Sequence, residues 1–362
     1  MLLYYKTFLL TLFLPLAVLA GPVKGKHTKK KSINKSYTVE KDALILLDNK
    51  YGSMTITTWN QPKVAIEVQV EVTGDDEEDV DDKLKEVDVI FESSASRVSA
   101  RTQVDSSRKN WSWSSWFGSN NKVSVEINYV VKMPITNDLD ARNDYGTLSL
   151  DKLSGHARLN CDYGRMDIGE LLHEDNYIKM DYTNKSTIDY VKSATINADY
   201  SSITVDEAEK IELKADYTHS EFKKVIDLNI NTDYGSITIG EAVDFTGRGD
   251  YVSFKIGTII KSLNLNTDYG SINVSRLKAG FKEVTIRSDF TGVKVYYEND
   301  ANFDFEIDTE FAGISLSDTA TITRSDSDYT DKLKAGYNGS QNSGNTINIR
   351  TSYGGVKLKA ME

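Results

Sequence analysis

Acidic–aromatic pairs recur along this chain of 362 residues, at a spacing regular enough for their side chains to act together. The pairs are Asp144-Tyr145, Asp162-Tyr163, Asp181-Tyr182, Asp199-Tyr200, Asp216-Tyr217, Asp233-Tyr234, Asp250-Tyr251, Asp268-Tyr269, Asp289-Phe290 and Glu310-Phe311. Successive pairs are 17 to 21 residues apart, and Ser352-Tyr353-Gly354 follows 42 residues after the last pair. If each repeat stacks on the next, carboxylates form one column and aromatic rings form another.

Each repeat has the pattern of two short strands with a third apolar position between them. Runs such as Ile237-Thr238-Ile239 follow the aromatic residue, and runs such as Leu228-Asn229-Ile230 precede the next pair. Period-2 alternation of this kind indicates strands with one buried face. The repeats leave no room for helices. The sequence therefore predicts an all-β fold, a parallel β-solenoid of about ten coils of 17 to 21 residues over residues 136–362.

The aromatic residue lies at a corner, because the alternation changes parity across Asp233-Tyr234-Gly235. The glycine position also holds Thr183, Thr218 and Val252, so we expect no positive φ there and attribute the glycine to crowding beside the ring. We expect the corner aromatics to stack as a structural ladder of Tyr145, Tyr163, Tyr182, Tyr200, Tyr217, Tyr234, Tyr251, Tyr269, Phe290, Phe311 and Tyr353. A partner-binding stripe is the alternative.

The aspartate column has two interpretations. Carboxylates one strand spacing apart repel one another, and Ca²⁺ at Asp216, Asp233, Asp250 and Asp268 would relieve the repulsion. Alternatively, these side chains bond to their own backbone at the turn. The glycine-rich nonapeptide of calcium-loaded β-rolls is absent. We therefore predict no metal site and no cofactor.

The N-terminal segment predicts export. Residues 1–20 contain Lys6, an apolar run and small residues at a cleavage site, which is typical of a signal peptide. An uncleaved anchor is the alternative. Residues 21–36 are rich in lysine and predict a linker without regular structure. We expect the protein in the periplasm, on the cell surface or outside the cell, with no transmembrane span after cleavage.

Residues 37–135 lack the repeat and predict a β-sheet cap over the first coil. Strand patterns cover 64–72, 87–91, 98–104 and 123–131, and the charged stretch 75–85 predicts one short helix. The segment 49–56 resembles a coil corner. The domain order is thus a signal peptide, a linker, a cap over 37–135 and a repeat domain over 136–362.

Three of the four tryptophans lie close together in a loop rich in serine, glycine and asparagine. The binding candidates are Trp111, Trp113, Trp116 and Phe117. Exposed, this tryptophan cluster would contact a sugar, a membrane interface or a protein. Packed down, it would be a lid over the end of the rod.

Composition excludes several classes. With 43 basic and 54 acidic side chains the net charge is −11, which argues against nucleic-acid binding. The single Cys161 excludes a disulfide framework. His156, His173 and His219 fall at unrelated phases of the repeat, no catalytic motif is present, and the short coils offer no cleft walls. We therefore expect a non-catalytic protein that binds an envelope, glycan or protein surface. An envelope-stress protein without a soluble ligand and a polysaccharide lyase or hydrolase are the alternatives.

The arrangement resembles a family of exported bacterial proteins described as "putative adhesins", related to the auto-transporter adhesin head domain. The features in common are the signal peptide, 49–56 followed by Trp59, Met133-Pro134 before Asn143-Asp144-Tyr145-Gly146, and Tyr-Gly corners up to the last residues. The resemblance covers 37–362. It implies a right-handed β-helix-like solenoid and an adhesive or envelope role.

Overall fold

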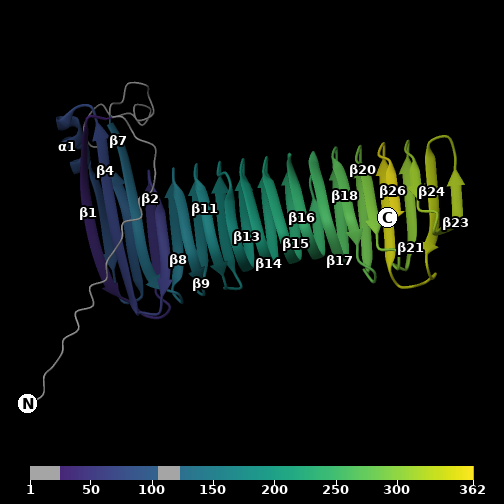
Figure 1. Ribbon diagram of the computed structural model, residues 1–362, viewed down its shortest axis with the longest axis horizontal. Coiled ribbons are helices and arrows are strands. Elements are labelled where there is room, and N and C mark those ends of the chain that lie inside the picture. Colours follow the sequence, from purple (N-terminus) through teal and green to yellow (C-terminus); the bar gives the residue numbers. More distant parts are fainter. Residues whose placement is uncertain (1–24, 105–122, 362) are drawn as a thin grey trace, which may run out of the picture.

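The computed structural model describes residues 25–104 and 123–361, which form a long rod of strands (Figure 1). All 26 strands in these residues belong to one hydrogen-bonded sheet, and α1 (Glu77–Glu86) is the only helix found in them. The all-β prediction with one short helix is confirmed. Most strands lie across the long axis of the rod, side by side, and the two ends differ from the middle.

The middle of the rod is a parallel stack. Its strands are β8 (Asp138–Asp144), β9 (Thr147–Leu153), β10 (Ala157–Asp162), β11 (Arg165–Leu171), β12 (Asn176–Asp181), β13 (Ser186–Asp199), β14 (Ser202–Asp216), β15 (His219–Asp233), β16 (Gly235–Arg248), β17 (Val252–Asp268), β18 (Ser271–Leu277), β19 (Glu283–Asp289) and β20 (Gly292–Tyr297). Each repeat pairs in register with the next, so that Asp199 is opposite Asp216 and Asp216 is opposite Asp233. The sequence repeat is therefore the structural repeat.

The buried positions explain why each long strand bends. In β14, Val205, Ala208 and Ile211 are all buried although they are three residues apart, so the inward parity changes twice along the strand. Each change turns the chain while the apolar side chains keep pointing inward. The buried side chains of all repeats join one continuous hydrophobic core along the rod.

The N-terminal end is an antiparallel sheet that continues into the stack. Its strands are β1 (His27–Thr38), β2 (Leu44–Lys50), β3 (Met54–Trp59), β4 (Lys63–Gly74), β5 (Val87–Ser93), β6 (Arg97–Val104) and β7 (Val123–Pro134). Strand β4 pairs antiparallel with both β1 and β7. Strands β2 and β3 instead pair parallel with β8 and β9. A boundary at residue 135 thus separates strands that share one ladder, and residues 44–59 supply the first repeat, or coil, of the parallel stack.

The prediction that residues 21–36 form a linker is wrong from residue 27 onwards. Strand β1 pairs with β4 along its whole length, from His27 to Thr38. Its lysines reach carboxylates on neighbouring elements: Lys29 lies 2.6 Å from Asp81, and Lys30 lies 2.8 Å from Glu71. The charge pattern hid the strand, because Lys29, Lys30 and Lys31 pair with carboxylates and only Ile33 and Tyr37 pack against the apolar core.

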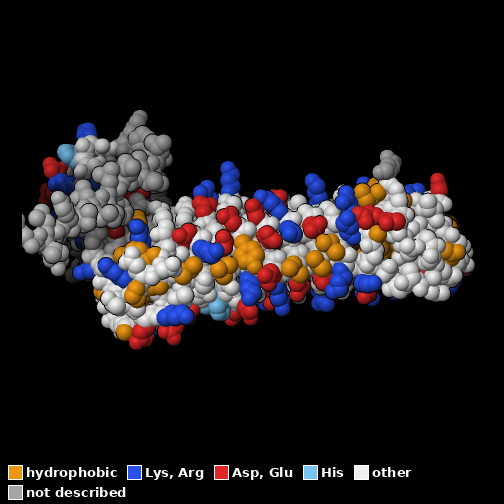
Figure 2. All heavy atoms as spheres, turned by 60° about the horizontal axis from the view of Figure 1, so that its bottom comes forward, with side chains coloured by type: hydrophobic (Ala, Val, Ile, Leu, Met, Phe, Trp, Pro, Cys, Tyr) orange, Lys and Arg blue, Asp and Glu red, His pale blue; other side chains and the backbone are white. Residues whose placement is uncertain are grey.

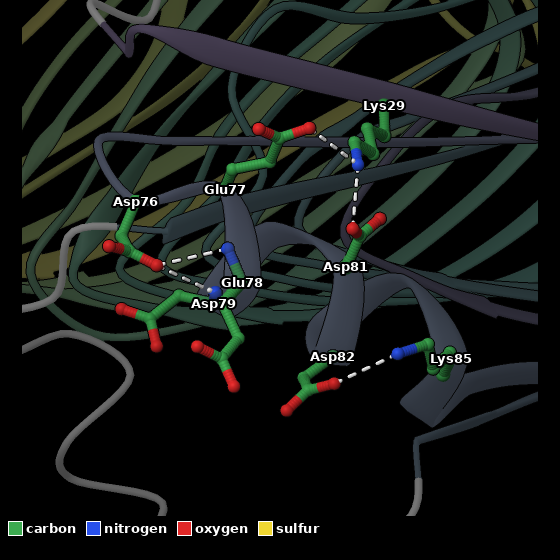
Figure 3. Close-up of polar contacts among 8 residues, drawn as sticks. All are labelled: Lys29, Asp76, Glu77, Glu78, Asp79, Asp81, Asp82 and Lys85. Atoms are coloured by element: carbon green, nitrogen blue, oxygen red, sulfur yellow. Dashed lines mark hydrogen bonds and ion pairs between the residues drawn. The ribbon is translucent and has the colours of Figure 1, made fainter.

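Helix α1 begins and ends close to the prediction, and its charges follow the helix dipole. The Asp76 carboxylate accepts hydrogen bonds from the backbone N–H groups of Glu78 and Asp79, which caps the N-terminus (Figure 3). Lys29 of β1 bridges to Glu77 and Asp81 on the same helix. These contacts attach α1 to the outer strand of the sheet.

At the C-terminal end, strand order departs from sequence order. The strands are β21 (Phe303–Glu310), β22 (Ile314–Leu316), β23 (Ala320–Ser327), β24 (Asp331–Asn338), β25 (Thr346–Ser352) and β26 (Val356–Ala360). Strand β25 lies between β19 and β21, and β26 lies between β20 and β22, parallel to both neighbours in each case. Strands β24 and β23 then extend the end in antiparallel pairing. The doubled step before Tyr353 therefore marks a coil inserted between two earlier ones, and no coil is missing.

Candidate functional site: the aromatic ladder and its flanks

The corner aromatics stack face to face along the rod. The ladder runs in spatial order through Tyr51, Tyr145, Tyr163, Tyr182, Tyr200, Tyr217, Tyr234, Tyr251, Tyr269, Phe290, Tyr353 and Phe311. Neighbouring ring centroids are 4.7 to 5.4 Å apart and the planes differ by 2° to 9°. The ladder therefore follows the strand spacing of the stack.

Every ring of the ladder stands on a residue with left-handed backbone. The φ angles lie between 50° at Tyr200 and 66° at Tyr51, although aromatic residues rarely adopt positive φ. The conformation costs each corner about 1 kcal/mol, which stacking of about 0.5–1.5 kcal/mol per pair offsets. As expected, Gly235 and Gly270 do not have positive φ.

The prediction that the glycines relieve crowding beside the ring is wrong, because the crowding group is backbone and not a ring. A Cβ atom on Gly235 would lie 2.3 Å from the carbonyl oxygen of Thr218, and one on Gly270 would lie 2.0 Å from that of Val252. The glycines therefore make room for the backbone of the preceding coil, not for a ring. Sequence alone did not show this, because the clash is between residues of different repeats.

The aspartate column bonds to the backbone of the neighbouring coil. The Oδ1 atom of Asp216 accepts from the N–H of Asp233 at 3.2 Å, and Asp233 accepts likewise from Asp250 at 2.8 Å. In return, the N–H of Tyr217 donates to the carbonyl oxygen of Asp233 at 3.0 Å. Asp250 and Asp268 accept in the same way from the next coil.

These bonds bear on the calcium interpretation. The carboxylates of Asp216, Asp233, Asp250 and Asp268 each keep one oxygen on a main-chain N–H. Within the described ranges, no group of three or more His, Cys, Asp or Glu side chains is placed to hold a metal ion. The bonding resembles the turn alternative, except that each partner lies one coil away.

The ladder presents ring edges to solvent, not ring faces. From Tyr163 onward the ladder residues are each 47–53% exposed, while both faces of each inner ring are covered by its neighbours. On the face drawn in Figure 2, hydrophobic side chains form a broken row along the rod with charged side chains on both sides. Sugar rings or cations cannot stack on covered faces. The exposed part of the ladder instead offers apolar ring edges, with phenol hydroxyls at regular spacing from Tyr163 to Tyr269.

The N-terminal end of the ladder is more buried. Burial, followed by the nearby Tyr145 and Asp144, raises the pKa of Tyr51 to about 12. Burial is also the main cause that raises the pKa of Asp144, and the charge of Lys50 opposes it. The pKa of Asp162 is raised by burial first and then by the charges of Asp181 and Asp144. Burial thus disfavours the charged form of Asp144 and Asp162 at this end of the column.

The remaining reactive side chains serve packing or surface roles. Cys161 is buried, its thiol lies 3.6 Å from the carbonyl oxygen of Gly146, and burial raises its pKa to about 12. A thiol with this pKa is not a nucleophile near neutral pH. His156 and His173 meet edge to face on successive coils, with centroids 5.6 Å apart. His219 bonds through Nδ1 to the Ser236 hydroxyl of the next coil.

One shallow depression brings carboxylates of three coils together. Its volume is about 430 Å³, and its lining includes Asp151, Asp167 and Asp189. Asp151 already accepts the N–H of Thr58 at 3.0 Å. The depression lies on an outer strand face near the start of the stack, which includes Thr55 and Ser149.

The other binding candidates, Trp111, Trp113, Trp116 and Phe117, lie outside the described residues.

Tyr51 belongs to the ladder but was missing from the expected set. Its Asn49-Lys50-Tyr51-Gly52 context was the available signal, since it matches the corner at Asn143-Asp144-Tyr145-Gly146. No helix of the described residues is long and apolar enough to span a bilayer.

Comparisons with known proteins give distant similarities. No family model matches the sequence, and no curated protein matches it. A "putative adhesin" from Parabacteroides merdae ATCC 43184 aligns at 12% identity over 94% of this chain and 99% of its own, with a TM-score of 0.33. One from Bacteroides fragilis NCTC 9343 aligns at 12% over 91% and 97%, with a TM-score of 0.28. A "putative lipid binding protein" from Parabacteroides distasonis ATCC 8503 aligns at 8% over 91% and 97%, with a TM-score of 0.29. At these scores the alignments assign neither a family nor a function.

Proposed function

We propose that this protein is an exported, non-catalytic rod of the cell envelope that binds an extended partner along the exposed edge of the ladder, in the manner of an adhesin. The observation that supports the proposal is the unbroken row of half-exposed rings on a stack of in-register coils. The seven successive tyrosines from Tyr163 to Tyr269 present hydroxyls one strand spacing apart, which suits a glycan or protein strand that lies along the rod. The half-exposed part of the ladder, from Tyr163 to Phe311, spans nine strand spacings or about 43 Å, which favours a polymer over a small ligand.

The proposal includes the finer architecture and the route of export. The parallel stack is a right-handed β-helix-like solenoid, the antiparallel sheet before it is its cap, and residues 1–20 are a cleaved signal peptide. In-register parallel pairing and one continuous core support the solenoid. N-terminal sequencing of protein recovered from periplasm, cell surface and medium tests both the cleavage and the location.

Binding is tested with immobilised protein against purified envelope glycans, whole cells and envelope protein extracts. The variant Tyr200→Phe/Tyr217→Phe/Tyr234→Phe keeps all rings of the ladder and removes three hydroxyls. We expect at least tenfold weaker binding, because several hydrogen bonds to the partner are lost together. Tyr190→Phe is the matched control, since its hydroxyl bonds to Glu209 away from the ladder. Unchanged affinity of the triple variant contradicts the ladder as the contact.

The tryptophan cluster remains a second proposed contact and needs its own variant. Changing Trp111, Trp113 and Trp116 together to Ala should weaken binding to the same preparations if the cluster touches the partner. If neither this variant nor the tyrosine variant changes binding, the adhesin-like role fails. The envelope-stress alternative, with no soluble ligand, then becomes the better explanation.

A polysaccharide-active enzyme is the other candidate, and the carboxylates of the depression near Asp167 favour it. Glycoside hydrolysis uses two carboxyl groups on opposite sides of the bond. Incubation with acidic and neutral polysaccharides should give no reducing ends or unsaturated products under the binding proposal. Turnover that disappears in Asp167→Asn would support the enzyme instead.

A further inference from the structure

The two outermost strands of the sheet differ in how they are protected. At the N-terminal end, β1 pairs with β4 alone among the described strands, and it carries Lys29, Lys30, Lys31 and Lys35 beside helix α1. Lysines along an edge strand oppose its pairing with a second copy of itself, because like charges would then lie together. The β1 edge is therefore disfavoured as a contact between two copies.

At the C-terminal end, β23 carries no lysine, and a register shift between Ile322 and Arg324 leaves Arg324 to Ser327 as its regular edge. In the part of the chain that the structure describes, β23 pairs only with β24, and it forms the far end of the rod (Figure 1). Nearly all of its side chains are exposed on both faces, including Ile322 at 46%. Tyr329, in the turn that follows, is 100% exposed. A short strand with open backbone groups and two exposed apolar side chains is a template for pairing.

The backbone of β23 directs hydrogen-bonding groups outward at Ser325. In the hairpin, the N–H of Asp328 donates to the carbonyl oxygen of Asp331 at 3.0 Å. Hydrogen bonding alternates along an antiparallel pair, so the N–H and C=O groups of Ser325 and Ser327 point away from β24. These groups are available to a strand that pairs with the open edge.

The side chains around Ser325 are self-complementary. When β23 is placed antiparallel to its own copy with Ser325 opposite Ser325, Arg324 of each copy, which also pairs with Asp326 of its own strand, faces Asp326 of the other. The pairing puts opposite charges across the two-fold axis twice. The same register places Ser325, whose backbone groups point outward, at a hydrogen-bonded position on the axis.

From these observations we propose that two copies of this chain join end to end through antiparallel pairing of their β23 strands, centred on Ser325. The interface is isologous, so it closes after two copies. The lysine-bearing β1 edge disfavours contact between copies at the other end. The dimer is a rod of twice the length, with the two N-terminal sheets at its outer ends.

The test is the mass of the purified protein by sedimentation velocity over a wide concentration range. We expect the weight-average mass to rise towards twice the monomer mass as concentration increases. Arg324→Asp puts like charges across the axis twice and should weaken association at least tenfold. Asp326→Arg should do the same. Asn34→Asp, a charge change on β1, is the control and should leave the dimer intact.

Two further arms fix the register. The double variant Arg324→Asp/Asp326→Arg restores opposite charges across the axis and should recover the wild-type mass. An equal mixture of the two single variants should form a heterodimer, although each alone is a monomer. A protein that is monomeric at all concentrations, or a double variant that stays as weak as the single ones, overturns the proposal. Circular dichroism of each single variant separates a lost interface from a lost fold.

Discussion

The central coils and the C-terminal end of the rod use the same corner but differ in how sequence order relates to spatial order. From β13 to β17 every coil contacts the coil before and after it in the chain. At the C-terminal end, β25 and β26 are inserted between strands that precede them in the sequence. The rings nevertheless continue through Phe290, Tyr353 and Phe311 without a break. A coil is therefore specified locally, whereas its neighbours are chosen by packing.

Two deletions of equal length should give the largest contrast. Deleting 346–362 removes the inserted coil and leaves β19 to β22 without their shared partners. We expect unfolding of the C-terminal region, dye-detected apolar surface and aggregation. Deleting 218–234 removes one 17-residue repeat and joins Tyr217 to Gly235, which recreates a Tyr-Gly corner.

The shortened rod should stay soluble and cooperatively folded, because each remaining coil still has an in-register neighbour. Size-exclusion chromatography and hydrogen exchange measure both outcomes. If both shortened proteins stay soluble and folded, the inserted coil is no more important for folding than a central coil, which contradicts the expected difference between the two regions.

Truncating a core side chain in a central coil or in the inserted C-terminal coil should lower the free energy of unfolding by similar amounts. Leu228 lies between Ile211 and Phe245, and Ile347 of the inserted coil lies between Val284 and Phe305. Both are buried. Each change to Ala should destabilise its region by about 2–5 kcal/mol, measured by urea unfolding with local hydrogen exchange. A much smaller cost at Ile347 would mean that the inserted coil is loosely packed.

The ladder corner should respond in the same way in both regions. Changing Tyr217 or Tyr353 to Gly should destabilise less than changing it to Ala, by about 1 kcal/mol, because glycine adopts positive φ without strain. Both variants lose two ring contacts, so the difference isolates the backbone. At Thr204, an ordinary strand position, the order should reverse and Gly should be the worse substitution. Thermal unfolding of the six variants measures the stability difference between Gly and Ala at each of the three positions.

The smallest expected effects are electrostatic. The folded-state pKa of Asp162 is raised by burial and by its acidic neighbours, so the folded state gains stability as pH falls from that raised pKa towards the ordinary aspartate range near 4. Asp162→Asn should remove this gain. At Asp244, burial opposes but does not cancel the bonds from Ser262 and Lys261, and the pKa is lowered.

Asp244 therefore stabilises the fold above the ordinary pKa, and that contribution is lost as pH falls through the lowered one. Asp244→Asn should remove a loss of folding stability on acidification, whereas Asp162→Asn should remove a gain of folding stability. Melting temperatures between pH 3 and pH 7 compare the two variants. Changes of the same sign would contradict the assigned roles.

Much of the fold was predictable because it is local. Alternating apolar residues set the strands and their buried faces, and the helix followed from its charged stretch. Strand β1 was missed because its lysines face carboxylates, so the usual apolar signal is absent. The left-handed φ of the corner tyrosines was missed because nothing in a single repeat reveals that stacking between repeats offsets the strain.

The sequence by itself determined the repeat, the all-β class and the positions of the corners, because each depends on residues within one coil. The tertiary structure decided which coils are neighbours. It placed Tyr353 between Phe290 and Phe311, joined Tyr51 to Tyr145, and left β23 as an open edge. The physical reason is that near-identical coils offer near-identical pairing surfaces, so the pattern within a coil cannot specify its partner. Connection lengths and the packing at both ends make that choice.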